Sequence, residues 1–256
     1  MALEIIHGEN LRVLQSLPDG YFNLIYIDPP FNTGKKQSRQ NISYKDSFGN
    51  YKEFITPRIQ EAKRVLSEDG SLFLHLDWRE THYVKVWTDE IFGRDNFQNE
   101  IIWSYDYGGR SKSKWSAKHD TILWYSKSEI YTFNYDVIDR IPYMAPGLVG
   151  PEKAAKGKTL TDVWWHTIVP TNGKEKTGYP TQKPLGILER IVKVHSKPGD
   201  YLLDFFAGSG SFGEAAHRHG RHCLLIDENP QAISVMSERF QSRAVPHTIL
   251  SSNVSE

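Results

Sequence analysis

Short apolar runs, each followed closely by an acidic residue, recur along the chain and predict five β-strands. They cover residues 3–6, 22–27, 71–76, 201–203 and 222–226. Parallel strands place their carboxyl ends at one edge of a sheet, which is where ligands of open α/β proteins bind. We therefore expect the acidic residues that follow these runs to lie along a common ligand-binding crevice.

Amphipathic segments with helical periodicity separate the strands. They cover residues 10–17, 51–66, 79–92, 184–195, 213–219 and 230–240. Strands that alternate with such helices predict an α/β protein with a Rossmann-like, doubly wound and mostly parallel sheet. A length of 256 residues fits a single domain of this kind, spanning residues 1–256.

The middle of the chain departs from this alternation. Residues 103–180 contain five of the seven tryptophans and several proline-containing turns. Two short apolar runs, 101–104 and 121–125, predict a final hairpin of the sheet, whereas the chain beyond Tyr143 has the composition of loops. We interpret the region of about residues 105–180 as a loop-rich insertion that recognises the target.

Charge is balanced overall, with 31 lysines and arginines against 31 aspartates and glutamates, but two segments are basic. Residues 34–50 carry a net charge of +3 and residues 110–118 a net charge of +4, with aromatic residues among the charges. Both segments are predicted to be loops, which either bind a phosphate backbone and unstacked bases or form ordinary solvated surface. Their candidate nucleic-acid-binding residues are Lys35, Lys36, Arg39, Arg110, Lys112 and Lys114.

The remaining composition excludes several classes of protein. No apolar run approaches the roughly 18 residues of a membrane span, and an acidic start argues against an export signal. The single cysteine, Cys223, excludes an internal disulfide and a cysteine zinc site, and we expect no metal. These features predict a soluble, cytoplasmic protein without a membrane partner.

The segment Asp28-Pro-Pro-Phe31 directly follows a predicted strand. Its two prolines lack amide donors, so local carbonyl groups stay free to accept hydrogen bonds beside the Asp28 carboxylate. The exocyclic amine of a nucleobase fits such acceptors, and Phe31 offers a face for stacking. Hydrogen bonds to Asp28 and to the Pro29 carbonyl stabilise the positive charge that develops on an attacked amine. An ordinary Pro-Pro turn after a helix-capping aspartate is the alternative.

A glycine-rich segment, Gly208-x-Gly-x-x-Gly213, follows another predicted strand and precedes a helix. Asp227 lies 19 residues after Gly208, a spacing close to that of dinucleotide sites in which the acid binds ribose hydroxyls. S-adenosylmethionine also lies over a glycine loop with its ribose on an acid. Asp204 favours this second cofactor, because a carboxylate in the turn repels a pyrophosphate and attracts an ammonium group.

A third segment, Tyr179–Leu185, has Thr181 near the start of a predicted helix. Hydroxyl and amide donors there, together with Lys183, suit a carboxylate such as that of methionine. An ordinary helix start has the same composition.

Together these segments resemble the β-class amino-methylating DNA methyltransferases, in which the catalytic motif precedes the cofactor motif. Asp28-Pro-Pro-Phe31 is similar to the catalytic tetrapeptide of the family, and Asp204–Gly210 to its cofactor loop. Pro180–Pro184 resembles the segment that completes the cofactor pocket, and Glu9 stands where the family usually has aspartate. The run that continues to Gly34 also resembles modification subunits of type III restriction systems, although those chains are far longer.

The resemblance implies an S-adenosylmethionine-dependent methyltransferase that modifies N6 of an adenine flipped out of double-stranded DNA. The implied catalytic residues are Asp28, Pro29, Pro30 and Phe31. The implied cofactor-binding residues are Glu9, Asn10, Asp28, Thr181, Lys183, Asp204, Phe206, Ala207, Gly208, Gly210, Asp227 and Asn229.

Other activities differ in how well they use these motifs. Cytosine-N4 methylation is the nearest alternative, although members with that specificity mostly carry serine at the position of Asp28. Cytosine-C5 methylation is excluded, because it needs a nucleophilic cysteine and Cys223 lies within a predicted buried strand. A nicotinamide-dependent oxidoreductase leaves the Asp-Pro-Pro-Phe segment without a role, and a DNA-binding module with a degenerate methylase fold is the third class. A homodimer, a cognate restriction endonuclease and a nucleoid-associated location are expectations that the resemblance leaves open.

Overall fold

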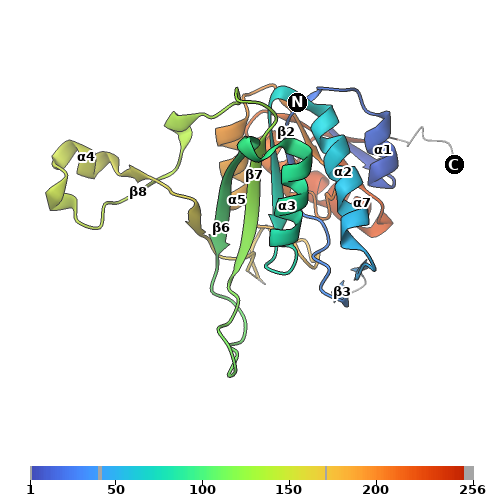
Figure 1. Ribbon diagram of the computed structural model, residues 1–256, viewed down its shortest axis with the longest axis horizontal. Coiled ribbons are helices and arrows are strands. Elements are labelled where there is room, and N and C mark those ends of the chain that lie inside the picture. Colours follow the sequence, from blue (N-terminus) through green and yellow to red (C-terminus); the bar gives the residue numbers. More distant parts are fainter. Residues whose placement is uncertain (1, 40–41, 171, 251–256) are drawn as a thin grey trace.

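The computed structural model describes residues 2–39, 42–170 and 172–250. Within these residues a sheet runs through the body of the molecule (Figure 1). It has nine strands in the order β10-β6-β7-β5-β2-β11-β12-β1-β13. In that order the strands are Val163–Trp165, Phe97–Ser104, His119–Ser126, Leu66–Leu76, Phe22–Ile27, Tyr201–Asp204, His222–Asp227, Leu3–His7 and His247–Leu250.

Neighbouring strands of this sheet are parallel except around β7, which is antiparallel to both β5 and β6. The predicted Rossmann-like, mostly parallel α/β fold is confirmed, and so is the predicted hairpin, which β6 and β7 form. The five predicted strands correspond to β1, β2, β5, β11 and β12.

Helices cover both faces of the sheet, and the sheet separates the core into two clusters of buried side chains. Helices α1, α2 and α3 pack on one face, where Ile55 and Ile59 are fully buried, and α5, α6 and α7 pack on the other, where Ile191 and Phe240 are fully buried. In that order the helices are Asn10–Ser16, Tyr51–Val65, Thr81–Phe92, Leu185–His195, Ser211–Arg218 and Pro230–Ser242. All six lie within two residues of their predicted ends. In the described part of the chain no helix has the length and apolar character to cross a membrane.

The strand order brings five acidic residues to one edge of the sheet. Strands β5, β2, β11, β12 and β1 are neighbours, and their carboxyl ends carry or precede Asp77, Asp28, Asp204, Asp227 and Glu9. Because these strands are parallel, the five residues follow one another along the same edge. The expected row of acids is therefore present.

The prediction of a loop over residues 34–50 was wrong. These residues contain an antiparallel hairpin of β3 (Lys35–Arg39) and β4 (Ile42–Asp46), closed where Gly34 N donates to Asp46 O at 2.9 Å. Both strands are mostly polar, so the alternation that marks a strand with one buried face is missing. The short edge strands β10 and β13 also lay outside the predicted elements.

An arm within the insertion projects from the body beyond β6 (Figure 1). The two ends of the arm meet where Leu160 N donates to Asp139 O at 3.1 Å. The Asp139 carboxylate is paired with Arg190 at 2.8 Å and Lys193 at 2.9 Å, both on α5. These contacts anchor the arm to the body at one place. The short elements of the insertion and its surroundings are η1 (Arg94–Asn96), η2 (Tyr135–Val137), β8 (Arg140–Ile141), η3 (Pro146–Leu148), α4 (Pro151–Lys156) and β9 (Lys158–Thr159).

Candidate active site

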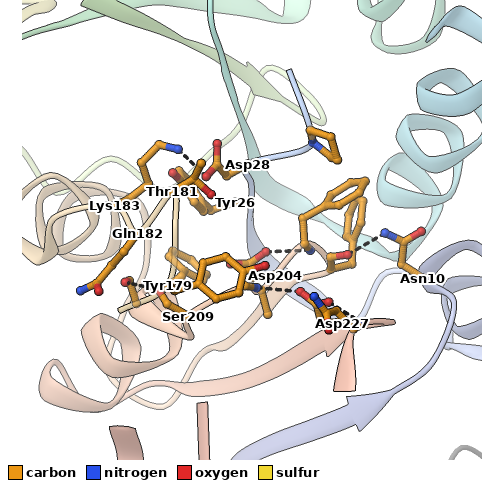
Figure 2. Close-up of a pocket in the computed structure, with 18 of the residues that line it drawn as sticks. Asn10, Tyr26, Asp28, Tyr179, Thr181, Gln182, Lys183, Asp204, Ser209 and Asp227 are labelled. Atoms are coloured by element: carbon orange, nitrogen blue, oxygen red, sulfur yellow. Dashed lines mark hydrogen bonds and ion pairs between the residues drawn. The ribbon is translucent and has the colours of Figure 1, made fainter. Parts of the chain in front are cut away.

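A cavity of about 260 Å³ lies at the carboxyl ends of β2, β11 and β12 (Figure 2). It is lined by Asn10, Asp28, Asp227, residues 181–183 and residues 204–209, together with side chains from neighbouring elements. The three segments that the sequence singled out therefore meet at one cavity, although they are far apart along the chain.

The glycine-rich loop between β11 and α6 forms one wall of this cavity. Ala207 N donates to Ile226 O at 3.1 Å, and Gly208 N donates to Asp227 Oδ2 at 2.8 Å. Gly208 has a φ of +49°, a left-handed conformation that glycine adopts readily. A Cβ at this position would lie 3.0 Å from the Tyr179 ring. The loop is thus held tightly, and at Gly208 it presents backbone to the cavity.

Two buried carboxylates flank this loop. Burial raises the pKa of Asp204 well above its usual range, even though Phe206 N donates to it at 2.9 Å. Burial also raises the pKa of Asp227 to about 6, against the lowering effect of hydrogen bonds from Asn229 N and Gly208 N. Hydroxyl donors or a positive charge beside such groups stabilise their ionised forms. The cavity therefore suits a ligand that carries hydroxyl groups and a cationic group.

Asp28 and Asp227 lie on opposite sides of Asp204 (Figure 2). Asp28 Oδ2 is ion-paired with the ammonium group of Lys183, whereas Oδ1 is buried and has no hydrogen-bond partner among the residues that the structure describes. Lys183 Nζ also lies 4.9 Å from the centroid of the Phe31 ring. This end of the cavity thus combines a carboxylate oxygen that accepts no hydrogen bond from the described residues, a lysine ammonium group and a nearby aromatic ring.

The sequence of residues 22–238 matches the family model N6_N4_Mtase, described as DNA methylase. The chain belongs to the N6/N4 DNA methylase family. Over 93% of its length it is 30% identical to the DNA adenine methyltransferase YhdJ of Escherichia coli (strain K12), of which it covers 83%. Over 94% of its length it is 29% identical to the type II methyltransferase M.HpaI of Haemophilus parainfluenzae, of which it covers 75%.

Solved structures share the fold of this methylase. The PvuII DNA methyltransferase, described as cytosine-N4-specific, has a TM-score of 0.69 at 18% identity, over 98% of this chain and 87% of that one. A putative DNA modification methylase from Thermus thermophilus, complexed with S-adenosyl-L-methionine, has a TM-score of 0.67 at 21% identity, over 98% and 99% of the two chains. The family resemblance is confirmed, and it leaves no support for a nicotinamide-dependent oxidoreductase.

Glu9, expected to contact the cofactor, lies outside the lining of the methylase cavity. Its carboxylate caps α1, accepting hydrogen bonds from Leu11 N at 3.0 Å and Arg12 N at 2.9 Å, and pairs with Arg58 at 2.6 Å. Burial acts to raise the pKa of Glu9, but these hydrogen bonds and the Arg58 charge outweigh it and lower the pKa. The geometry gives Glu9 a structural contact in place of the expected one.

Two further expected cofactor contacts are arranged differently. A Cβ on Gly210, whose φ is +70°, would lie 2.8 Å from Met236 Cγ, so this glycine lets α7 approach the loop and does not line the cavity. Lys183 lines the cavity, but its ammonium group is engaged by Asp28. The buried carboxylate of Asp28 attracts the charge that the sequence had assigned to a methionine carboxylate.

Some cavity residues carry no local sequence signal. Arg58 of α2 lines the cavity and donates from Nε to Asn10 Oδ1 at 2.6 Å, while Asn10 Nδ2 donates to Phe205 O at 2.7 Å. Arg58 thereby fixes the Asn10 amide at the cavity wall. Tyr26 of β2 also lines the cavity and stacks on Phe212 at 5.2 Å between ring centroids. Within their elements both residues fit ordinary helix and strand patterns, which is why the sequence did not reveal them.

The basic segment 110–118 lies in the connection between β6 and β7, which extends below the body in the view of Figure 1. Arg110 is ion-paired with Asp106, and Lys114 Nζ lies 5.7 Å from the centroid of the Trp78 ring. The side chain of Trp115 is 99% exposed. Because β6 runs in the same direction as β2, this connection begins at the sheet edge that holds the cavity, and it carries cations and an exposed indole there.

The other candidate DNA-binding residues lie in two places. Lys112 is exposed on the same connection between β6 and β7. Three more belong to β3, where their side chains are outside the described part of the structure: Lys35, Lys36 and Arg39.

Proposed function

We propose that this methylase transfers a methyl group from S-adenosylmethionine to N6 of an adenine flipped out of double-stranded DNA. The observation that carries the proposal is Asp28 Oδ1, a buried acceptor without a partner among the described residues, on a side chain that lines the cavity. A buried polar atom left without a hydrogen bond is unfavourable, and an N–H group of a bound ligand would satisfy it. The exocyclic amine of adenine carries two such donors.

Asp28 favours the reaction because positive charge develops on the amine as it is attacked. The N6 lone pair is delocalised into the adenine ring, so the free amine is a weak nucleophile. Hydrogen bonds from its N–H groups to Asp28 and the Pro29 carbonyl favour the tetrahedral form of the nitrogen and stabilise the developing charge. Phe31 is assigned to stack on the base, and the turn is fixed where the Tyr51 hydroxyl donates to Pro30 O at 2.7 Å.

The donor set of the cavity supports S-adenosylmethionine as the cofactor, which supplies a methyl group activated on a positively charged sulfur. Asp227 is assigned to the ribose hydroxyls, Asp204 to the ammonium group and Thr181 to the carboxylate of the methionine part. The related fold of a methylase complexed with S-adenosyl-L-methionine supports the same choice. The other residues assigned to the cofactor are Asn10, Phe206, Ala207, Gly208 and Asn229.

Adenine is proposed in preference to cytosine because of the residue type at position 28. The aspartate there resembles the adenine-N6 enzymes, whereas cytosine-N4 enzymes mostly carry serine. The relative from Escherichia coli is named a DNA adenine methyltransferase, which supports this choice. Cytosine N4 is the second candidate, because the PvuII enzyme with the same fold is described as cytosine-N4-specific.

Mapping of methylated bases tests the proposal. Unmethylated bacterial DNA is incubated with the protein and S-adenosylmethionine, and modified positions are read by long-read sequencing. We expect N6-methyladenine within one recurring sequence, and none when heat-inactivated protein is used. N4-methylcytosine at the recurring sequence would overturn the choice of adenine, and the absence of any modified base would overturn the proposed activity.

The setting of this activity is also part of the proposal. Relatives named type II methyltransferases support a role in restriction–modification, with a cognate restriction endonuclease that cleaves the same sequence. The methylase would then act in the cytoplasm on nucleoid DNA, and the region of about residues 105–180 would recognise the target. A homodimer is compatible with this arrangement and is tested by light scattering of the free protein.

Replacing Asp227 with alanine should weaken the binding of S-adenosylmethionine by about 1–3 kcal/mol, because buried ribose hydroxyls lose their acceptor. The affinity of the unaltered protein should also fall as the pH drops through about 6, where the Asp227 carboxylate becomes protonated and accepts hydrogen bonds less well. Calorimetry between pH 5 and pH 8 measures both effects. Asp200→Ala, at the opposite edge of the sheet, is the control and should keep the affinity. Equal affinity in Asp227→Ala and the control would place the ribose elsewhere.

Replacing Arg110 or Lys112 with alanine should lower DNA affinity for all sequences and reduce the salt dependence by about one ion each, if they contact phosphates. The exposed pair of Arg110 with Asp106 is worth at most about 1 kcal/mol, so it does not prevent Arg110 from reaching DNA. If Arg110 reads a guanine edge instead, its loss should cost roughly 1–3 kcal/mol at one base pair only. Fluorescence anisotropy over a salt series separates these results.

The control for the loop variants is Lys197→Ala, an exposed lysine before β11 at the opposite edge of the sheet. It should leave affinity and salt dependence unchanged. Loop variants that behave like this control would mean that the basic connection is only solvated surface and that DNA binds to another face.

A further inference from the structure

Lys183 makes a buried contact that the assigned cofactor role does not explain. Its side chain is 8% exposed, and its ammonium group is paired with Asp28 Oδ2, the two residues being 155 positions apart (Figure 2). We propose that Lys183 is the positioning residue of Asp28: it holds Oδ2 and so directs Oδ1 towards the amine of the target base. This inference rests on the proposed function, in which Asp28 accepts a hydrogen bond from that amine.

The two oxygens of the Asp28 carboxylate differ in their hydrogen bonding, and this difference is the basis of the inference. A carboxylate with two free oxygens can rotate about its Cβ–Cγ bond and present either of them. Here Oδ2 is held by Lys183, and the buried Oδ1 is left without a partner among the described residues. Fixing one oxygen fixes the direction of the other, so the acceptor is oriented before the base arrives.

The backbone around Lys183 is itself held firmly, so the lysine can act as a fixed point. Gln182 accepts a hydrogen bond from Thr177 N at 2.9 Å and donates from Nε2 to Glu175 O at 2.6 Å. Glu175 Oε2 in turn accepts from Leu185 N at 3.1 Å, at the start of α5. The segment on both sides of Lys183 is therefore tied to residues 175–177, and the ammonium group is delivered to Asp28 from a rigid support.

Other carboxylates near Lys183 also stabilise the position of its ammonium group beside Asp28. The buried Asp204 lies close enough that the charge of Asp28 acts to raise its pKa, while the charge of Lys183 acts to lower it. Lys183 also acts to lower the pKa of Asp120, a buried residue at the start of β7. An ammonium group among three carboxylates reduces their mutual repulsion, which favours the position of Lys183 beside Asp28.

Substitution of Lys183 separates this role from binding of the methionine carboxylate. Lys183→Met keeps a side chain of similar length without charge, and Lys183→Arg keeps the charge. With saturating S-adenosylmethionine, we expect Lys183→Met to slow single-turnover methylation at least tenfold while the Kd for the cofactor, from calorimetry, changes less than threefold. Lys183→Arg should restore the rate to within about threefold of the unaltered protein.

Lys85 provides a matched control on α3. Its ammonium group is paired with Asp89 at 2.6 Å and lies 4.4 Å from the centroid of the Phe97 ring. Lys85 thus has the same two kinds of partner as Lys183, on a side chain that is 25% exposed and outside the cavity lining. Lys85→Met should leave both the methylation rate and the cofactor Kd unchanged. The control therefore measures what the loss of such a lysine does to the fold alone.

A second comparison asks whether Lys183 acts through Asp28. When Asp28 is already alanine, adding Lys183→Met should slow the remaining single-turnover rate by no more than about twofold, because the group it positions is gone. Losses that multiply in the double variant would overturn the inference. So would a Lys183→Met protein that keeps its single-turnover rate but binds the cofactor more than tenfold more weakly, since Lys183 would then hold the methionine carboxylate.

Failure of the proposed function has a different signature. In that case the unaltered protein and the Lys85→Met control transfer no methyl group to DNA of any sequence, even though both bind S-adenosylmethionine. The positioning role would be overturned with it. If Lys183→Met does not fold, as judged by loss of cofactor binding and of a cooperative thermal transition, the Lys183→Arg variant decides: a tenfold loss of rate there, with the charge retained, would contradict the inference.

Discussion

Asp28→Ala is expected to slow methyl transfer at least a hundredfold, while the Kd for S-adenosylmethionine changes only a few-fold. The variant removes the acceptor for the amine on which positive charge develops, a loss on the order of 3 kcal/mol or more in the barrier. The residues assigned to the ribose and to the ammonium group of the cofactor are Asp227 and Asp204, so we expect cofactor binding not to depend on the Asp28 carboxylate. Single-turnover assays with tritiated cofactor give the rate, and calorimetry gives the Kd.

Two comparisons complete this experiment. Asp28→Asn keeps one carbonyl acceptor at the same place, and its rate should lie between those of the alanine variant and the unaltered protein. Asp19→Ala removes an exposed carboxylate before β2, at the opposite edge of the sheet, and should have no effect. A rate above about one tenth in Asp28→Ala would contradict the acceptor mechanism.

Glu214→Ala is expected to lower the free energy of unfolding by about 3–5 kcal/mol. The Glu214 side chain is 1% exposed and is paired with Arg239 at 2.5 Å, Arg243 at 2.5 Å and Arg218 at 2.6 Å. Arg239 is fully buried, so removing the carboxylate leaves its charge without compensation. Urea unfolding followed by circular dichroism measures the loss.

The same substitution should also weaken cofactor binding, because Arg239 supports the glycine loop. Arg239 Nη1 donates to Ser211 Oγ at 2.9 Å and to Ser209 O at 3.3 Å. Glu189→Ala is the control, since Glu189 makes a partly exposed pair with Arg218 at 3.3 Å and should cost less than about 1 kcal/mol. If Glu214→Ala were no less stable than this control, the buried cluster would not support the loop.

The sequence was sufficient to predict the edge of the sheet where the cavity lies, because parallel strands convert a linear pattern into a spatial one. Asp28, Asp204 and Asp227 each follow or end a short apolar run, and three neighbouring strands bring them together. No such rule applies to Lys183 and Asp28, which are 155 positions apart and meet only because α5 begins beside β2. Arg58 is similar, since its contact with the cavity depends on how α2 packs across the sheet edge.

The polar hairpin of β3 and β4 shows a different limit. Hydrophobic alternation reports burial of one strand face, and this hairpin pairs through its backbone while its sequence is mostly polar. Sequence periodicity therefore detects strands of the core more readily than strands that stand beside it. Of the two segments that we assign to DNA, residues 34–50 contain this hairpin and were predicted wrongly. Residues 110–118 form the loop that the sequence predicted.

The anchoring of the arm has a consequence for the evolution of the chain. The arm leaves and rejoins the body at Asp139 and Leu160, whose backbones are hydrogen-bonded to each other. When the two ends of a segment are joined, the entropic cost of closing the loop grows slowly with the length of the segment. Each doubling of the length adds only about 0.6 kcal/mol to this cost. We therefore expect that residues 140–159 can change in length or be replaced in related proteins without disturbing the sheet and its row of acids.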